Sequence, residues 1–339
     1  MKIASAALVL PLMSQAANYS AKTAQIEGVE AVLLADAAHK TEVTVLPSVG
    51  NIAYRMMVNG KNALWDPYEK LAEMKAKPVQ AGVPFLEPWA NRLDQDSYYA
   101  NGKKYHLNPD LANFRRDGHQ KPIHGLLSFS PLWRVIELRA DHRGAWVTSR
   151  LEFWKYPDLI AQFPFAHTIE MTYRLVDGTL EVETSLLNHA TEPMPVAIGY
   201  HPYFQVHDAP RDEWTVHLAA REKLTLSSDL IPTGERTPVQ YPDPLRLKGV
   251  TLDDVFTGLT ADAQFSVQGK NEKVAVKYGP KYTVAVVYAP PGKSFICFEP
   301  MSAITNAFNL AHAGTYKDLQ SIPPGGQWRE SFWISTSGF

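Results

Sequence analysis

The chain has 339 residues, of which 45% are hydrophobic and 20% are charged, a balance typical of a globular protein. Its 33 basic and 35 acidic residues leave a formal net charge of −2, which argues against nucleic acid as a partner. The single cysteine, Cys297, excludes an internal disulfide framework and a thiolate metal cluster.

Residues 1–17 have the layout of a secretory signal peptide. Lys2 precedes the apolar run Ile3–Met13, and small residues flank Gln15. This run is shorter than the ~20 residues of a transmembrane helix, and no later apolar run could span a bilayer. We therefore predict cleavage near Ala16 or Ala17 and a secreted or periplasmic protein. The alternative is a cytoplasmic protein with an N-terminal extension.

Residues 18–339 are expected to form a single domain, because no composition break or internal repeat divides them. Helical patterns are scarce. The first element in chain order is a short helix over Pro67–Lys77, since a proline at its start is followed by good helix formers. Val147–Phe153 comes next, and its alternating residues are typical of a half-buried strand.

The strongest strand signal is the pair of alternating segments Ile169–Leu175 and Leu180–Leu186. Asp177-Gly178 between them predicts a tight β-hairpin, because this dipeptide favours the positive φ of a two-residue turn. Further strands are predicted over Tyr282–Tyr288, Phe295–Phe298 and Ser331–Ser335. Many short strands with glycine and proline turns predict an all-β fold, a large antiparallel β-sandwich with few short helices.

Two polar clusters lie in apolar surroundings before residue 130. In the first, Arg92 follows Trp89 and Asn91. Arg92 is either the partner of a structural ion pair or a donor to a polyhydroxylated or anionic ligand, for which Trp89 offers a flat apolar face. In the second cluster His124 precedes Gly125, and it is either an ordinary loop residue or a functional one.

Two further clusters follow predicted strands. His201 lies between Tyr200 and Tyr203, and it is either a core histidine or a side chain presented to a pocket. Glu299 follows four apolar residues, and desolvation there would raise its pKa toward that of a general base at neutral pH. The alternative is a solvated glutamate on an edge strand. Asp253, beside Asp254, is a weaker acidic candidate.

Taken together and in this order, these clusters resemble the aldose 1-epimerase (galactose mutarotase) family. The matching segments are Asn91-Arg92, His124-Gly125, His201–Phe204, Leu252–Phe256, Glu299–Met301 and the closing turn Pro324–Gln327. The resemblance extends from about Glu42 to Ser335, nearly the whole mature chain.

The resemblance implies a β-supersandwich that interconverts the α and β anomers of a free aldose without a cofactor or a metal. It implies Glu299 as the general base and His201 as the general acid. The residues expected to contact the sugar are His124, Arg92, Asp253, Asn91, Trp89 and Tyr203. The expected partner is therefore a small-molecule sugar, and the sequence gives no sign of an oligomeric state.

This chemistry fits those residue types. Opening a cyclic hemiacetal takes a proton from the anomeric hydroxyl and gives one to the ring oxygen, so one acid and one base suffice. The open aldehyde then rotates about C1–C2 and closes on its other face. A bell-shaped dependence of the rate on pH is expected, with Glu299 ionised and His201 protonated in the productive form.

Three alternatives stay open. One is a hexose-6-phosphate mutarotase, in which the adjacent Arg115 and Arg116 would receive the phosphate. The sequence favours an exposed loop pair instead, and export would separate the protein from most sugar phosphates. The second is a carbohydrate-binding protein on the same scaffold that does not turn over. The third is a glycosidase, in which Asp253 or Asp254 would lie about 5–10 Å from the carboxylate of Glu299.

Overall fold

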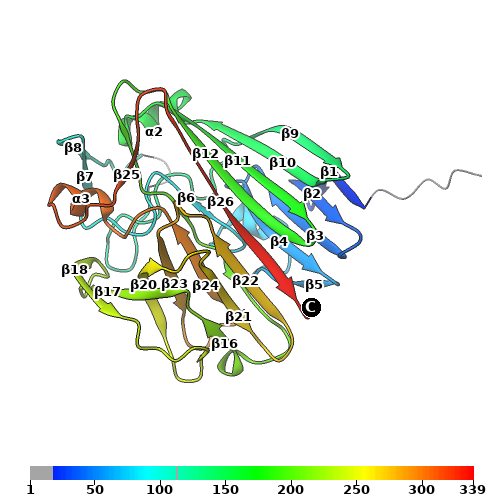
Figure 1. Ribbon diagram of the computed structural model, residues 1–339. Helices are drawn as coiled ribbons and strands as arrows, with labels where there is room; N and C mark the ends of the chain where they lie inside the picture. Colours follow the sequence, from blue (N-terminus) through cyan, green and yellow to red (C-terminus); the bar gives the residue numbers. More distant parts are fainter. Residues whose placement is uncertain (1–17, 112–113) are drawn as a thin grey trace, which may run out of the picture.

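The computed structural model describes residues 18–111 and 114–339. The predicted signal peptide, residues 1–17, lies outside the described residues, so export of the protein stays a prediction. In the part of the chain that the structure describes, no helix is long and apolar enough to cross a membrane. The predicted fold class is confirmed: 50% of the residues are in strands and 8% in helices, and the strands form several antiparallel sheets (Figure 1).

A nine-stranded antiparallel sheet runs through the molecule (Figure 1). Its strands, in spatial order, are β19 (Leu245–Arg246), β16 (Thr215–His217), β21 (Gln264–Gln268), β22 (Lys273–Tyr278), β26 (Gln327–Ser337), β12 (Thr179–Asn188), β11 (His167–Val176), β10 (Gly144–Glu152) and β9 (Arg134–Asp141).

Two other large sheets pack against the nine-stranded sheet, a five-stranded one near β9–β11 and an eight-stranded one near β21. The five-stranded sheet consists of β1 (Tyr19–Ile26), β2 (Val29–Asp36), β3 (Thr41–Leu46), β4 (Ile52–Val58) and β5 (Lys61–Asn62). The eight-stranded sheet consists of β18 (Pro232–Pro238), β17 (Ala220–Leu226), β20 (Leu252–Leu259), β23 (Val284–Ala289), β24 (Ile296–Met301), β14 (Gly199–Tyr200) and β6 (Phe85–Leu86), with β15 (Tyr203–Phe204) paired to β24.

The remaining elements are short connections. Two strand pairs are β7 (Ser97–Ala100) with β8 (Lys103–His106) and β13 (Met194–Val196) with β25 (Gln320–Ile322). The helices are α1 (Leu71–Ala76), α2 (Pro157–Gln162) and α3 (Ala307–His312), with the 3-10 turns η1 (Phe153–Lys155) and η2 (Arg211–Glu213).

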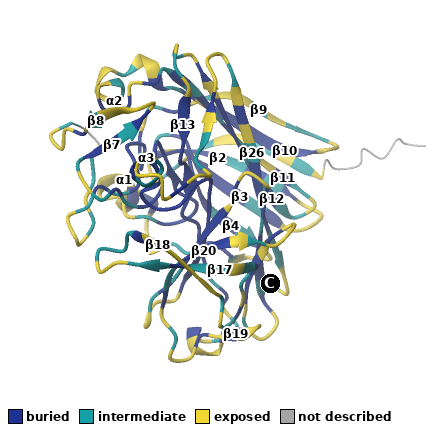
Figure 2. Ribbon diagram, turned by 60° about the vertical axis from the view of Figure 1, so that its left-hand side comes forward, coloured by how far each residue is buried: buried dark blue, intermediate teal, exposed yellow. Residues whose placement is uncertain are grey.

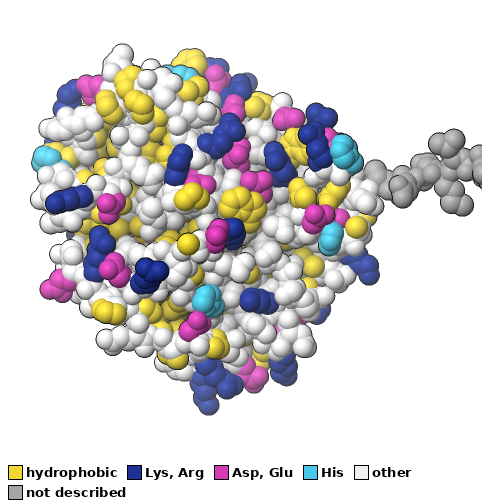
Figure 3. Space-filling model, viewed as in Figure 1, with side chains coloured by type: hydrophobic (Ala, Val, Ile, Leu, Met, Phe, Trp, Pro, Cys, Tyr) yellow, Lys and Arg dark blue, Asp and Glu magenta, His cyan; other side chains and the backbone are white. Residues whose placement is uncertain are grey.

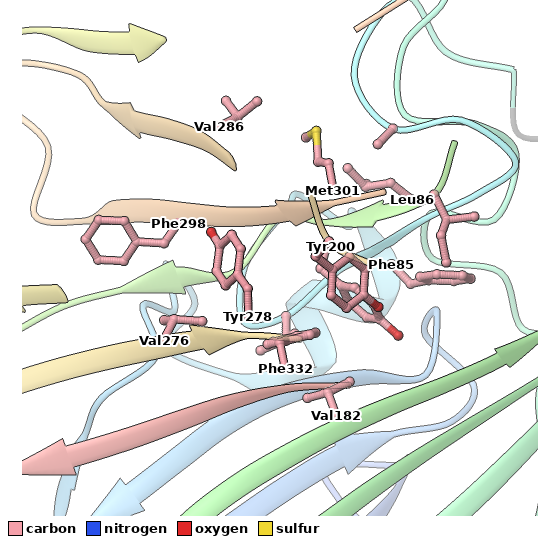
Figure 4. Packing of buried hydrophobic residues seen from close by; sticks show 14 of the residues in the cluster. Phe85, Leu86, Val182, Tyr200, Val276, Tyr278, Val286, Phe298, Met301 and Phe332 are labelled. Carbon is pink, nitrogen blue, oxygen red and sulfur yellow. The ribbon is translucent and has the colours of Figure 1, made fainter. Parts of the chain in front are cut away.

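The core lies between the sheets. Figure 4 shows Val182, Val276 and Phe332 of the nine-stranded sheet facing Tyr200 and Phe298 of the eight-stranded sheet. Buried residues gather along the strands and exposed residues along the loops and edges (Figure 2). On the face shown in Figure 3, basic and acidic side chains are interspersed rather than gathered into one basic stripe.

The predicted hairpin is confirmed. β11 and β12 pair from His167↔Asn188 to Val176↔Thr179, and the two turn residues have φ values of 47° at Asp177 and 69° at Gly178. These are the positive values that a two-residue hairpin turn requires.

The predicted helix over Pro67–Lys77 is too long, because α1 covers only Leu71–Ala76. The carboxylate of Asp66 accepts a hydrogen bond from the backbone N–H of Tyr68 (2.9 Å), which holds Pro67 in a turn before the helix. The hydroxyl of Tyr68 also donates to the carbonyl of Lys77 (2.9 Å), at the residue that caps the helix.

Candidate active site

Glu299 lies in the middle of β24, opposite Val286 of β23. The predicted strand ended at Phe298, but the observed strand continues to Met301. Because side chains alternate along a strand, Glu299 faces away from Phe298, whose ring packs against Phe265 of the nine-stranded sheet. Loops cover this outer face of the sheet, so Glu299 is only 1% exposed.

His201 lies in the short connection between β14 and β15, which both pair with β24. This connection brings the imidazole to the carboxylate of Glu299, with Nε2 3.3 Å from Oε1. The imidazole stacks on the ring of Tyr203, with centroids 4.7 Å apart and 9° between the planes. The two residues expected to act as base and acid are thus in contact.

Two loops with left-handed backbone cover this pair. Asn91 has a φ of 58° and His124 a φ of 62°. The backbone N–H of His124 donates to the carbonyl of Asn91 (2.9 Å), which joins the loops. Gly125 is required by their close approach, since a Cβ there would lie 2.1 Å from the carbonyl oxygen of Glu87. The loop sequences therefore fix the place of His124 beside His201, with ring centroids 5.3 Å apart.

A buried contact between the side chains of Glu87 and His167 supports both loops. Nε2 of His167 is 3.0 Å from Oε1 of Glu87, and both side chains are at most 2% exposed. Nδ1 of His167 donates to the carbonyl of Phe165 (2.6 Å), and its ring stacks on Phe153. The carbonyl of Glu87 accepts from the N–H of Leu126 (2.7 Å), so this residue ties the first loop to the second. Sequence reasoning missed the pair, because nothing local to either residue signals the other.

Arg92 extends along the cavity wall. Its Nε donates to the carboxylate of Asp117, and its Nη1 donates to Oδ1 of Asn91 (2.9 Å). Asp117 neutralises the guanidinium and fixes its orientation. Arg92 therefore has the structural ion-pair partner of the first alternative, and it also lines the cavity, as the second alternative requires.

Asp253 enters the cavity from β20, where it lies opposite Tyr288 of β23. The next residue, Asp254, points to the other face of the sheet, where it pairs with Lys223 (2.8 Å) and accepts from the hydroxyl of Tyr241 (2.9 Å). Of the two adjacent carboxylates, only Asp253 can therefore reach a ligand beside Glu299.

These side chains line one cavity of about 240 Å³. Its walls are Asn91, Arg92, Ile123, His124, His201, Tyr203, Asp253, Val286, Tyr288 and Glu299. A larger cavity of about 680 Å³ lies near Tyr278, Tyr282 and Tyr316, but no imidazole lines it. The smaller cavity is the one that contains the contact between the carboxylate of Glu299 and the imidazole of His201. Within the described ranges, no three histidine, cysteine or acidic side chains are grouped as metal ligands.

Trp89 does not line this cavity, in contrast to the other residues expected to contact the sugar. The residue is 2% exposed and belongs to the hydrophobic core. The backbone at this point bridges to Ala197, with the N–H of Ala90 donating to the Ala197 carbonyl (2.7 Å), and the indole is packed inside. The aromatic wall of the cavity comes from Tyr203 and Tyr288. The sequence predicts a strand that ends at Tyr288 but does not indicate that this side chain belongs to the site.

Burial controls the protonation of the pair. Desolvation raises the pKa of Glu299 well above its usual range, the charge of Asp253 adds to this shift, and Arg92 opposes it. Desolvation lowers the pKa of His201, and the charges of Arg115 and Arg92 contribute to that shift. The shift of Glu299 has the direction expected from the sequence. Both shifts favour the neutral forms of the two side chains.

We expect Glu299→Gln to gain stability relative to the wild type as the pH rises. Because folding raises the pKa of Glu299 above 4.5, the folded protein binds more protons than the unfolded chain above that pH. The stability of the wild type therefore falls as pH rises through this window, by up to about 1.4 kcal/mol per pH unit. The glutamine lacks this proton, so the difference in Tm between variant and wild type should widen from pH 5 to pH 8 in thermal unfolding. A constant difference would contradict the raised pKa.

The antiparallel sandwich with this buried carboxylate–imidazole pair on the outer face of one sheet has a galactose mutarotase-like fold. A galactose mutarotase-like protein from Clostridium acetobutylicum superposes with a TM-score of 0.84 at 20% identity, over 95% of this chain and 99% of that one. The galactose 1-epimerase of Lactobacillus acidophilus NCFM superposes with a TM-score of 0.74 at 14% identity, over 96% and 100%.

Sequence comparison gives the family. The aldose 1-epimerase family matches residues 35–335, and the chain belongs to this family. Among curated relatives, the uncharacterized protein YihR of Escherichia coli K12 is 23% identical over 231 residues, which cover 66% of this chain and 70% of YihR. The uncharacterized protein YphB of the same organism is 21% identical over 249 residues, 71% and 78% of the two chains.

Proposed function

We propose that this protein is an aldose 1-epimerase that interconverts the α and β anomers of a sugar by acid–base ring opening and reclosure. The observation that carries the proposal is the contact between Nε2 of His201 and Oε1 of Glu299, 3.3 Å apart in a polar cavity. With one titratable proton between them, one member of the pair would accept a proton while the other donates one.

In the proposed reaction the carboxylate of Glu299 takes the proton of the anomeric hydroxyl while the imidazolium of His201 protonates the ring oxygen. The C1–O5 bond breaks, and the aldehyde rotates about C1–C2 and recloses with the two proton transfers reversed. The active form, carboxylate with imidazolium, differs from the resting form by the shift of one proton between the two side chains. Binding of the hydroxyls by Arg92, His124 and Asp253 would orient the sugar.

The pKa shifts support a broad bell-shaped pH profile. A second proton enters the pair only at low pH, since the pKa of His201 is lowered, and the shared proton leaves only at high pH, since the pKa of Glu299 is raised. The limbs of the bell therefore lie further apart than the ordinary values of histidine and glutamate would place them.

Polarimetry of freshly dissolved α-D-glucose and α-D-galactose tests the proposal. We expect the rotation to reach equilibrium faster than in buffer, in proportion to enzyme concentration, with no added metal or cofactor. A protein that binds these sugars in calorimetry but leaves the rate at that of buffer would be a carbohydrate-binding protein. A rate with glucose 6-phosphate alone would indicate the hexose-6-phosphate mutarotase instead.

A further inference from the structure

Arg211, in the turn η2, is the one arginine that is buried among the residues that the structure describes, with 8% of its surface exposed. By comparison, Arg115 is half-buried and Arg116 exposed, so the expectation of an exposed pair is correct for Arg116 alone. The carboxylate nearest to Arg211 is that of Asp212, 3.3 Å from Nη1, and this side chain is 62% exposed. A surface carboxylate of this kind does not explain why the guanidinium is buried.

The guanidinium of Arg211 instead donates to backbone carbonyls of two separate segments. Nη1 donates to the carbonyl of Leu247, and Nη2 donates to those of Val250 and Ala289, each at 2.7 Å. Leu247 and Val250 bound the turn that leads into β20, and Ala289 is the last residue of β23. The planar fork of an arginine suits several acceptors in fixed directions. Arg211 therefore ties the start of β20 to the end of β23.

These two strand ends carry one wall of the candidate active site. Asp253 is the second residue of β20, and Tyr288 is the residue before Ala289 in β23. The two lie directly opposite each other in the ladder, and both line the cavity. Side chains that face each other across an antiparallel pair move with the backbones that carry them. A displacement of either strand end would therefore move Asp253 and Tyr288 relative to the rest of the cavity.

The turn that holds Arg211 is itself anchored in the core. Trp214 is 1% exposed, and its indole N–H donates to the carbonyl of Ala209 (2.9 Å). The carbonyl of Trp214 accepts a hydrogen bond from the N–H of Leu247 (3.0 Å), which brings the turn before β20 against η2. A buried side chain held in this way gives rigid support to the residues that it contacts.

We propose that Arg211 is a positioning residue that holds Asp253 and Tyr288 in place for the sugar. This inference rests on the proposed function and adds to it a residue that the sequence did not indicate. Arg211 does not line the cavity, so it acts through the backbone of the two strand ends. The proposed proton transfers belong to Glu299 and His201, so Arg211 contributes to binding of the sugar. An interaction that binds substrate and transition state equally affects KM and leaves kcat unchanged.

Arg211→Met tests the proposal, because methionine keeps an apolar stem and removes every donor. For the sugar that the wild type turns over fastest, we expect KM to rise about tenfold, as on loss of one good hydrogen bond. The value of kcat should stay within about threefold of the wild type. Arg211→Lys keeps the charge and some of the donors, so its KM should lie between those of the wild type and Arg211→Met. Exchange between anomers, measured at equilibrium by NMR, gives both constants.

Asn188→Ala is the matched control. Asn188 is fully buried, and its Nδ2 also donates to two backbone carbonyls, those of Glu192 (3.0 Å) and Ile322 (2.9 Å), but it does not line the cavity or touch its strands. Its loss should lower Tm and leave KM unchanged. The proposal is overturned if folded Arg211→Met has the KM of the wild type, or if Asn188→Ala raises KM as much. If Arg211→Met does not fold, a lowered Tm with unchanged KM in Arg211→Lys overturns it.

Fluorine NMR of protein labelled with fluorotyrosine gives a second measurement that needs no turnover. The resonance of Tyr288 is the one that disappears in Tyr288→Phe. It should shift or broaden in the Arg211 variants and stay unchanged in Asn188→Ala. If the wild type exchanges no anomers but this resonance responds as expected, the epimerase function alone is overturned. If the wild type exchanges anomers and KM is unchanged in Arg211→Met, the positioning role alone is overturned.

Discussion

Glu299→Gln should lower kcat for anomer exchange by about 10²–10⁴-fold, the usual contribution of one general base. The amide has nearly the shape of the carboxylate but cannot accept the proton of the anomeric hydroxyl. KM should change little, because Arg92, His124 and Asp253 still line the cavity. Polarimetry or NMR exchange on the sugar that the wild type turns over fastest gives both constants.

Asp254→Asn is the control for this substitution. It also removes a carboxylate from the same sheet, but one that pairs with Lys223 outside the cavity. Its kcat should stay within about threefold of the wild type, because the side chain of Asp254 does not line the cavity. If Glu299→Gln behaved like the control while remaining folded, Glu299 would not be the base.

His201→Asn should cause a loss of similar size, about 10²–10⁴-fold in kcat, because ring opening needs a proton on the leaving ring oxygen. In the proposed mechanism the two side chains act as a unit, and the effects of substitutions within such units are strongly non-additive. The kcat of the double variant, His201→Asn with Glu299→Gln, should therefore lie within about tenfold of the kcat of the less active single variant.

The measurement is a double-mutant cycle in kcat, with His217→Asn as the control. His217 is an exposed histidine that pairs with Asp243 and does not line the cavity, so its loss should leave kcat unchanged. If the two single losses multiplied in the double variant, the two residues would act in independent steps, and the shared-proton mechanism would have to be abandoned.

Local patterns in the sequence were sufficient for several strands of the sandwich and pointed to most of the residues that line the cavity. The Asp177-Gly178 turn and the alternation on either side specify the hairpin without help from distant residues, because turn geometry and side-chain period are local properties. No single polar residue that interrupts an apolar segment was enough to identify the site. Taken together, seven of the eight expected site residues line one cavity: Glu299, His201, His124, Arg92, Asp253, Asn91 and Tyr203.

Where sequence reasoning failed, a distant contact was decisive. Trp89 and Arg92 are three residues apart in similar surroundings, yet a bridge to Ala197 buries the tryptophan and an ion pair with Asp117 holds the arginine at the cavity. The helix before residue 77 is shorter than its propensity suggests, because Asp66 holds the preceding residues in a turn.

The sequence by itself determined the all-β class and the main hairpin, since these depend on periodicity and on residue type, and its resemblance to the aldose 1-epimerase family implied the proposed acid and base. Only the tertiary structure decided that Nε2 of His201 lies 3.3 Å from Oε1 of Glu299, and that Asp117 pairs with Arg92 beside them. The physical reason is that protonation and charge depend on burial and on neighbours brought together by folding, and neither can be read from positions along a chain.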